Sequence, residues 1–309
     1  MMSKNHKSRR GFLGKAALAT TAFMSAPALI TKAESTHSIE EVFGGDEKYK
    51  VAVCDWMILK RQKLGAFKRT AEIGADGLEL DMGGLGSRVV FDNKLRNPID
   101  RKVFKEEAEK YNLEICSIAM SGFYAQSLAE RDIAPMMDDA INTMVMMGVK
   151  TAFLPFGVKG DLIQNPELRP VLVEKFKTII APKAEAAGVV IGIETALDAA
   201  GEAAFLDEVG SSNIQSYFNF QNPLKNGRDL HEELRTLGKD KICMIHASDE
   251  DKVWLENNDR IDMPKVKQTL DDMGWSGWLV VERSRDANNP RDVVGNYGAN
   301  TKYLKSVFQ

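Results

Sequence analysis

The sequence predicts a single α/β domain, a (β/α)8 TIM barrel, that follows an N-terminal signal peptide. Eight apolar, strand-forming runs alternate with stretches whose apolar residues recur three or four positions apart, which is the spacing of one helix face. Residues 48–309 contain no linker rich in Pro, Gly or Ser, and their length fits one barrel of roughly 250 residues. We therefore expect one barrel over residues 48–309 rather than two domains.

The first element is the N-terminal segment, residues 1–33, which we interpret as a twin-arginine signal peptide and its tail. Arg9 and Arg10 precede a moderately apolar stretch, and Ala26-Pro27-Ala28 offers a cleavage site of small residues. This order predicts a periplasmic protein, exported by the twin-arginine route and without stable membrane insertion after cleavage. Because that route carries folded proteins, a cofactor could be loaded before export.

Cleavage of the leader would change the charge of the protein. The whole chain carries a net charge of −3 at pH 7, and residues 1–28 contain five basic residues and no acidic one, so the mature chain carries −8. An acidic protein with scattered charges has no electrostatic footprint for nucleic acid. We therefore expect no nucleic-acid partner.

The barrel elements follow in order. Helix-to-strand joins through a glycine recur at Gly74, Gly148, Gly188 and Gly274, as expected where a helix ends and the next strand begins. Pro182 should kink or end the helix that contains it. The predicted strands are Lys50–Asp55, Gly77–Asp81, Leu113–Ala119, Lys150–Pro155, Val189–Glu194, Gln215–Asn219, Lys241–His246 and Trp278–Glu282.

Four of these strands end on a residue that can bind a metal or move a proton: Glu194, Asn219, His246 and Glu282. The carboxyl ends of parallel strands lie on one face of a barrel, where such folds place their chemistry. Three oxygen donors and one imidazole suit Mn²⁺, Mg²⁺, Co²⁺ or Zn²⁺. We expect these four residues to converge on one divalent-metal site.

At these residues the sequence resembles the xylose-isomerase-like barrels, the superfamily of sugar phosphate isomerases and epimerases. The resemblance covers the chain after the leader. It rests on Gly74–Glu79, Ile193-Glu194-Thr195, Tyr217–Asn222, Ile245–Asp249 and Val281-Glu282-Arg283, which follow one another in the family's order.

The resemblance implies roles for individual residues. Glu194 and Glu282 are the expected carboxylate ligands and also the acid and base, and His246 is the expected imidazole ligand. Asp249 and Lys252, with Asn222, are expected near the substrate. Lys252 replaces the arginine that the family has there. The endonuclease branch is excluded, because its three-metal cluster needs more histidines than the chain has after the leader.

Asn219 departs from the family, which usually has Asp at this position. An amide oxygen can still ligate a hard cation, but one negative charge is lost and binding should weaken. Three alternatives follow: a working site with a weaker or different metal, a substrate site without metal, and a decayed site.

The expected chemistry is isomerisation or epimerisation of an unphosphorylated sugar or keto-sugar. A divalent ion makes the proton beside a carbonyl acidic, and one carboxylate removes it while the other returns it through an enediolate. Four aromatic residues are expected to offer an apolar face to the sugar ring: Trp56, Phe156, Trp254 and Tyr124. A lyase that eliminates from a keto-glycoside, and a non-catalytic carbohydrate-binding subunit, are the alternatives. The sequence leaves open the sugar, the metal and whether the chain forms a homo-oligomer.

Overall fold

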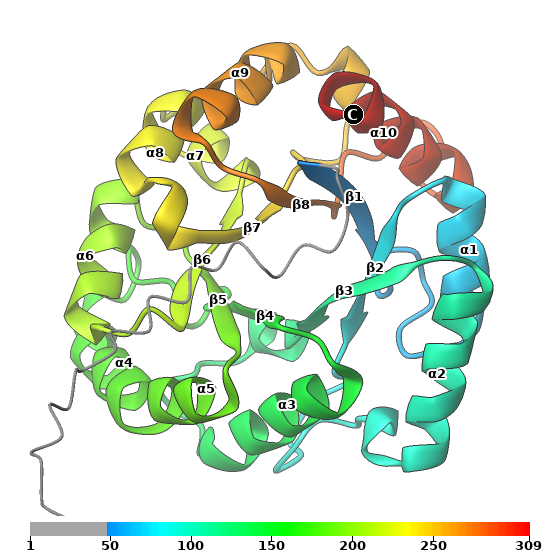
Figure 1. Ribbon diagram of the computed structural model, residues 1–309. Coiled ribbons are helices and arrows are strands. Elements are labelled where there is room, and N and C mark those ends of the chain that lie inside the picture. Colours follow the sequence, from blue (N-terminus) through cyan, green and yellow to red (C-terminus); the bar gives the residue numbers. More distant parts are fainter. Residues whose placement is uncertain (1–47) are drawn as a thin grey trace, which may run out of the picture. The chain divides into compact units, whose positions relative to one another are not determined.

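Eight parallel strands close into a barrel in their order along the chain (Figure 1). The computed structural model describes residues 48–309, so the predicted leader in residues 1–33 lies outside the described part. The strands are β1 (Tyr49–Cys54), β2 (Gly77–Asp81), β3 (Glu114–Ala119), β4 (Thr151–Pro155), β5 (Val190–Glu194), β6 (Ile214–Asn219), β7 (Ile242–His246) and β8 (Gly277–Val281). The predicted fold class is confirmed, with every strand within one residue of its expected bounds.

Helices surround the barrel and follow the strands in turn (Figure 1). They are α1 (Gly65–Ile73), α2 (Pro98–Lys110), α3 (Ala134–Met147), α4 (Arg169–Lys175), α5 (Ala181–Ala187), α6 (Ala199–Val209), α7 (Gln221–Lys225), α8 (Leu230–Leu237), α9 (Met263–Met273) and α10 (Val293–Phe308). No helix of residues 48–309 is both long and apolar enough to cross a bilayer.

The helix ends follow the local rules that the sequence indicated. Gly74 and Gly188 both adopt positive φ, 85° and 62°, where they end α1 and α5. This left-handed conformation lets their N–H groups bond back to the last turn at no steric cost. Just before Pro182, a π-helical turn at Phe176–Ile180 separates α4 from α5. Pro182 therefore lies in the first turn of a new helix, where its missing N–H is tolerated.

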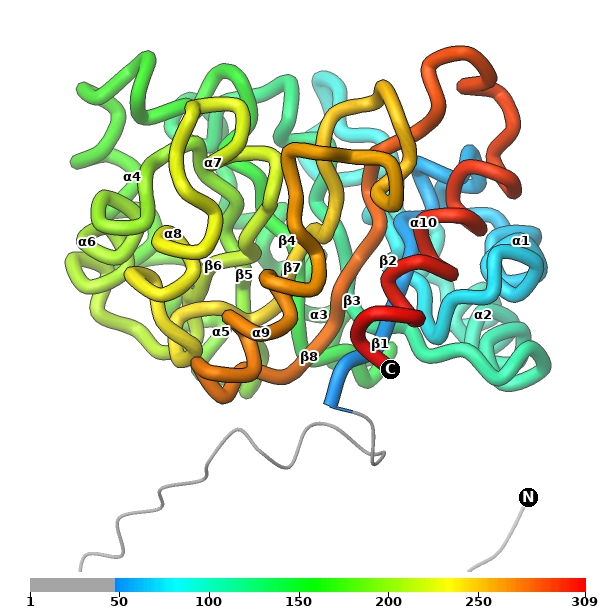
Figure 2. The backbone as a smooth tube through the Cα atoms, turned by 90° about the horizontal axis from the view of Figure 1, so that it is seen from above, coloured from blue at the N-terminus to red at the C-terminus, as the bar shows by residue number. Residues whose placement is uncertain are grey.

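Two layers of apolar side chains hold the barrel together. Strand residues such as Val51, Leu78 and Leu80 point outward and pack under the helices, while a second cluster that includes Phe153 and Tyr217 fills the interior. The C-terminal residue lies at the start of the barrel, where the Gln309 side chain donates to the Tyr49 carbonyl over 3.0 Å. Figure 2 shows the start of β1 beside the C-terminus at the lower edge of the barrel, opposite the loops that leave the strand ends.

Candidate active site

The alternation of strand side chains brings the four predicted residues to one end of the barrel interior. Glu194 and Asn219 end β5 and β6, His246 ends β7, and Glu282 directly follows β8. On β6, Tyr217 lies in the interior cluster two residues before Asn219. On β5 the matching position is Gly192, where a Cβ would lie only 3.0 Å from the Tyr217 side chain. Gly192 thus leaves room for the tyrosine beneath the site.

The two glutamates and the histidine lie within coordinating distance of one another. His246 Nδ1 lies 3.3 Å from Glu194 Oε2 and 3.7 Å from Glu282 Oε2. One potential ligand atom from each of the three residues lies within 4.8 Å of the other two. His246 and Glu282 are buried, whereas Glu194 is partly exposed. The structure therefore gathers the predicted acid, base and imidazole at one place.

His246 makes its second contact deeper in the barrel, with Glu79 of β2. His246 Nε2 lies 3.1 Å from Glu79 Oε2, and both side chains are inaccessible to solvent. Ser117 donates to the other Glu79 oxygen over 3.0 Å. Burial alone lowers the pKa of His246, but Glu282, Glu194 and Glu79 outweigh it and raise that pKa to about 10. The three surrounding carboxylates thus favour the protonated form of this buried imidazole.

Asn219 is buried and contacts both glutamates. Its amide nitrogen Nδ2 donates to Glu194 Oε2 over 3.3 Å and to Glu282 Oε2 over 3.2 Å. Its oxygen Oδ1 accepts the backbone N–H of Gln221 over 2.9 Å. Asn219 thus lies at the expected place, with its nitrogen towards the carboxylates.

Tyr124 completes the site from the loop after β3. Its hydroxyl donates to Glu282 Oε1 over 2.8 Å and lies 3.5 Å from Glu194 Oε2. Burial, and then the charges of Glu194 and Glu282, raise the pKa of Tyr124 well above its ordinary value, so the phenol stays protonated. A neutral donor therefore bridges the two predicted proton carriers.

Two more of the aromatic residues expected to face a sugar ring, Trp56 and Phe156, have different environments. Trp56 is partly exposed and stacks on Phe153, with ring centroids 6.4 Å apart and planes 10° apart. Phe156 does not face the strand ends. It is 1% exposed and packs against Phe176 and Phe205, outside the barrel wall. The prediction for Phe156 is wrong, because its ring fills the apolar layer under the helices.

The three predicted polar contacts to substrate also differ from one another. Asn222 is half-buried and donates to the Thr195 carbonyl over 3.0 Å. Asp249 is buried, accepts from Asn258 over 2.9 Å and pairs with Arg260 over 3.4 Å. Lys252 is exposed and pairs with Glu250 over 2.9 Å. The substrate role of each stays a prediction, and Asp249 Oδ1 is buried without a hydrogen-bond partner among residues 48–309.

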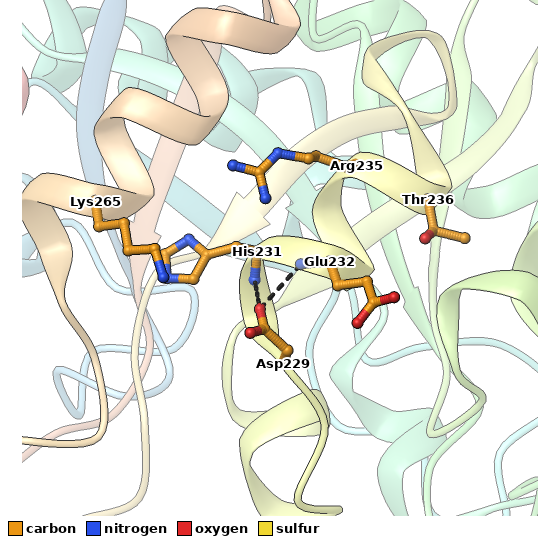
Figure 3. A pocket seen from close by; sticks show the side chains of 6 residues that line it. All are labelled: Asp229, His231, Glu232, Arg235, Thr236 and Lys265. Atoms are coloured by element: carbon orange, nitrogen blue, oxygen red, sulfur yellow. Dashed lines mark hydrogen bonds between the residues drawn. The ribbon is translucent and has the colours of Figure 1, made fainter.

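A shallow pocket also lies on the outside of the ring, between α8 and α9 (Figure 3). Asp229 lies at its edge and caps α8, accepting the N–H groups of His231 and Glu232 over 2.8 and 3.0 Å. Basic side chains, Arg235 and Lys265, line the same pocket. The acids and bases there come from adjacent helix surfaces, and none of the predicted site residues reaches it.

A protein-family model, the xylose isomerase-like TIM barrel, matches residues 67–306. The chain belongs to this family. The match spans nearly the whole barrel and confirms the family that the sequence motifs indicated.

Individual relatives of this xylose isomerase-like barrel are distant. A 2-epi-5-epi-valiolone 7-phosphate 2-epimerase from an Actinoplanes species is 25% identical over 199 residues, which are 62% of this chain and 71% of the relative. Two solved structures each align with 84% of this chain and 99% of their own. One is D-psicose 3-epimerase from Clostridium cellulolyticum, with 16% identity and a TM-score of 0.67. The other is 3-keto-D-glucoside 4-epimerase from E. coli, with 15% identity and a TM-score of 0.64. The relatives agree with the expected class of enzyme, an isomerase or epimerase.

Within residues 48–309, two groups of side chains have the spacing of metal ligands. Glu194, His246 and Glu282 form the first, and His246 with Cys54 and Glu79 forms the second. Burial, followed by the charges of Glu79 and Glu282, raises the pKa of Cys54 well above its ordinary value, so the second group offers a thiol instead of a thiolate. Two carboxylates and an imidazole, by contrast, suit a divalent cation such as Mn²⁺. The first group is the better fit.

Sequence reasoning missed two contacts that shape this site. Glu79 was noted only as part of a motif, although its place two residues after Gly77 on β2 marks it as inward-facing by the same alternation. Tyr124 was expected only as an apolar face for a sugar ring; it lies in a short 3₁₀ helix, Ser121–Ala125, where no local pattern shows that its hydroxyl reaches Glu282. The first could have been found from the sequence, and the second could not.

Proposed function

We propose that this chain is a metal-dependent carbohydrate epimerase or isomerase that acts on an unphosphorylated sugar or keto-sugar. The observation that carries the proposal is the placement of Glu194 and Glu282, whose Oε2 atoms are both within hydrogen-bonding distance of one nitrogen, Asn219 Nδ2. Two carboxylates this close, from different strands, can reach the same substrate carbon. Epimerisation needs that arrangement, since one group removes a proton and another returns it.

The residues of the site would have different roles in this reaction. Glu194, His246 and Glu282 would hold the cation, which supplies Lewis acidity that makes the proton beside the substrate carbonyl easier to remove. Glu282 is oriented by the Tyr124 hydroxyl, and Glu194 is the more exposed of the pair. One glutamate accepts the proton as an enediolate forms, and the other donates a proton to the opposite face or the neighbouring carbon. Trp56, which is partly exposed and stacks on Phe153, would offer its ring to the apolar face of the sugar.

The charges around the site favour a neutral sugar. Four cations in the loops after β7 and β8 are already paired with acids: Lys252 with Glu250, Arg260 with Asp249, and Arg283 and Arg285 with Asp251. A phosphate group would have to break one of these pairs to gain any of these four cations as a partner. The named substrates of the psicose and 3-keto-glucoside epimerases are likewise unphosphorylated, whereas that of the Actinoplanes relative is a 7-phosphate.

The proposed location is the periplasm. Support comes from Arg9, Arg10 and the Ala26-Pro27-Ala28 cleavage site, all outside the described residues. An unphosphorylated substrate fits this location, because sugar phosphates are mostly cytosolic.

Hydrogen exchange tests the function directly. We would incubate the purified protein with Mn²⁺ in D₂O, together with ketohexoses or 3-keto-glucosides, and follow the proton beside the carbonyl by NMR. We expect that signal to disappear as an epimer or isomer forms. Glu282→Gln should slow turnover by roughly 10²- to 10⁴-fold, because an amide cannot accept the proton. Glu232→Gln, on the outside of the barrel, is the matched control.

Two other outcomes would contradict the proposal. A product with a new carbon–carbon double bond would identify a lyase. Sugar binding without any exchange, in the presence of the metal, would identify a carbohydrate-binding subunit.

A further inference from the structure

We infer that Asn219 is a hydrogen-bond donor that clamps the carboxylates of Glu194 and Glu282 together, and that it is not a metal ligand. The second half of this inference rests on the cation of the proposed function. Three protein side chains would then hold that cation. The donor role itself stands without the cation.

A backbone hydrogen bond determines the orientation of the Asn219 amide. Gln221 begins α7, and its N–H is among the groups at a helix start that lack a partner within the helix. Asn219 Oδ1 accepts this N–H over 2.9 Å. A flipped amide would place NH₂ against N–H, two donors facing each other without an acceptor. Because Asn219 is only 4% exposed, water offers little compensation for that loss.

With Oδ1 used by the backbone, Nδ2 points at the carboxylates, and its two hydrogens have two acceptors: Glu194 Oε2 at 3.3 Å and Glu282 Oε2 at 3.2 Å. An amide nitrogen has no free lone pair for a cation. Its N–H groups present positive partial charge to the place where the cation would bind. Asn219 and a cation therefore compete for the same oxygen atoms.

Without a cation, the adjacent carboxylates of the partly exposed Glu194 and the buried Glu282 repel each other unless donors lie between them. Here Asn219 Nδ2, His246 Nδ1 and the Tyr124 hydroxyl face them. The amide thus stabilises the metal-free site and loses its contacts when a cation binds. A ligand would behave in the opposite way, stabilising only the metal-bound site.

The change in Mn²⁺ affinity when the Asn219 side chain is removed shows whether Asn219 is a clamp or a metal ligand. We would titrate the parent protein, Asn219→Ala and a control, Asn213→Ala, with MnCl₂ by calorimetry. Asn213 lies in the loop before β6, away from the site, and its side-chain amide donates to the carbonyl of Val189, just before β5. If Asn219 is a clamp, its removal destabilises only the metal-free site, and Asn219→Ala should bind Mn²⁺ about tenfold more tightly than the parent. The control should match the parent. A weaker affinity for Mn²⁺ in Asn219→Ala would overturn the inference.

Thermal unfolding of the metal-free proteins is a second test. The Tm of metal-free Asn219→Ala should fall by roughly 5 °C or more below that of Asn213→Ala, because bonds to two charged groups are lost. If none of the three proteins binds Mn²⁺, the proposed metal-dependent function is wrong. The comparison of Tm values then tests by itself whether Asn219 holds the two carboxylates together. An equal Tm for the two variants would overturn it.

Discussion

Glu202, a buried acid in α6, should make the stability of this protein depend on pH, and its replacement by Gln should remove that dependence. Glu202 is 6% exposed. Thr195 donates to its Oε2 over 2.6 Å, while Oε1 has no hydrogen-bond partner within residues 48–309. Burial raises the pKa of Glu202 from its ordinary value of 4.5 to about 7. The folded protein therefore holds a proton that the unfolded chain releases between these two pH values.

The sign and size of the effect follow from this pKa. A folded pKa above the unfolded one gives stability that is fully present below pH 4.5 and is lost as the pH rises through about 7. Each pKa unit corresponds to about 1.4 kcal/mol, so the free energy of unfolding should fall by about 3 kcal/mol over this range through Glu202 alone. Glu202→Gln keeps an acceptor for Thr195 but cannot ionise, so this fall should vanish.

The assay is urea unfolding of the parent and Glu202→Gln at several pH values from 5 to 8, analysed as a difference. Taking the difference cancels other groups that titrate in both proteins, such as Asp81, whose pKa is raised by burial to about 6. At pH 8 the variant should have gained about 2 to 3 kcal/mol relative to the parent, compared with pH 5. Glu232→Gln, with an exposed side chain, should show no such trend. A difference that stays flat between pH 5 and 8 would refute the reasoning.

Two further predictions concern turnover and export. Tyr124→Phe removes the hydroxyl that orients Glu282 but keeps the ring packed near Phe153, so kcat should fall by roughly 10- to 100-fold with little change in KM; steady-state kinetics that show an unchanged kcat would contradict a positioning role. Replacing Arg9 and Arg10 with lysine should keep the protein inside the cell, as measured by fractionation, and unchanged export would rule out the twin-arginine route.

The strand pattern was predictable from sequence because it depends on neighbours along the chain. Side chains alternate across a strand, so the last apolar residue and the polar residue after it mark where a strand ends and which face it uses. That rule placed Glu194, Asn219, His246 and Glu282 at the same end of the barrel, and the structure brings them together there. The same local logic correctly set the eight strands and the glycine helix ends.

Other features of the site depended on residues far apart in the sequence. Glu79 lies 167 positions from His246, and only closure of the barrel brings their side chains to 3.1 Å. Phe156 follows a strand as Trp56 does, yet it packs under the helices because Phe176 and Phe205 fill the space beside it. No local pattern distinguishes these two aromatic residues.

The sequence by itself determined that an amide occupies position 219, whereas only the tertiary structure decided which of its ends faces the glutamates. That choice depends on the start of α7, where the Gln221 N–H needs an acceptor and takes the amide oxygen. A buried donor without a partner costs about 1 to 3 kcal/mol, enough to fix the orientation of the side chain. The nitrogen is left to face two carboxylates supplied by β5 and the end of β8, and their positions follow from the closed barrel.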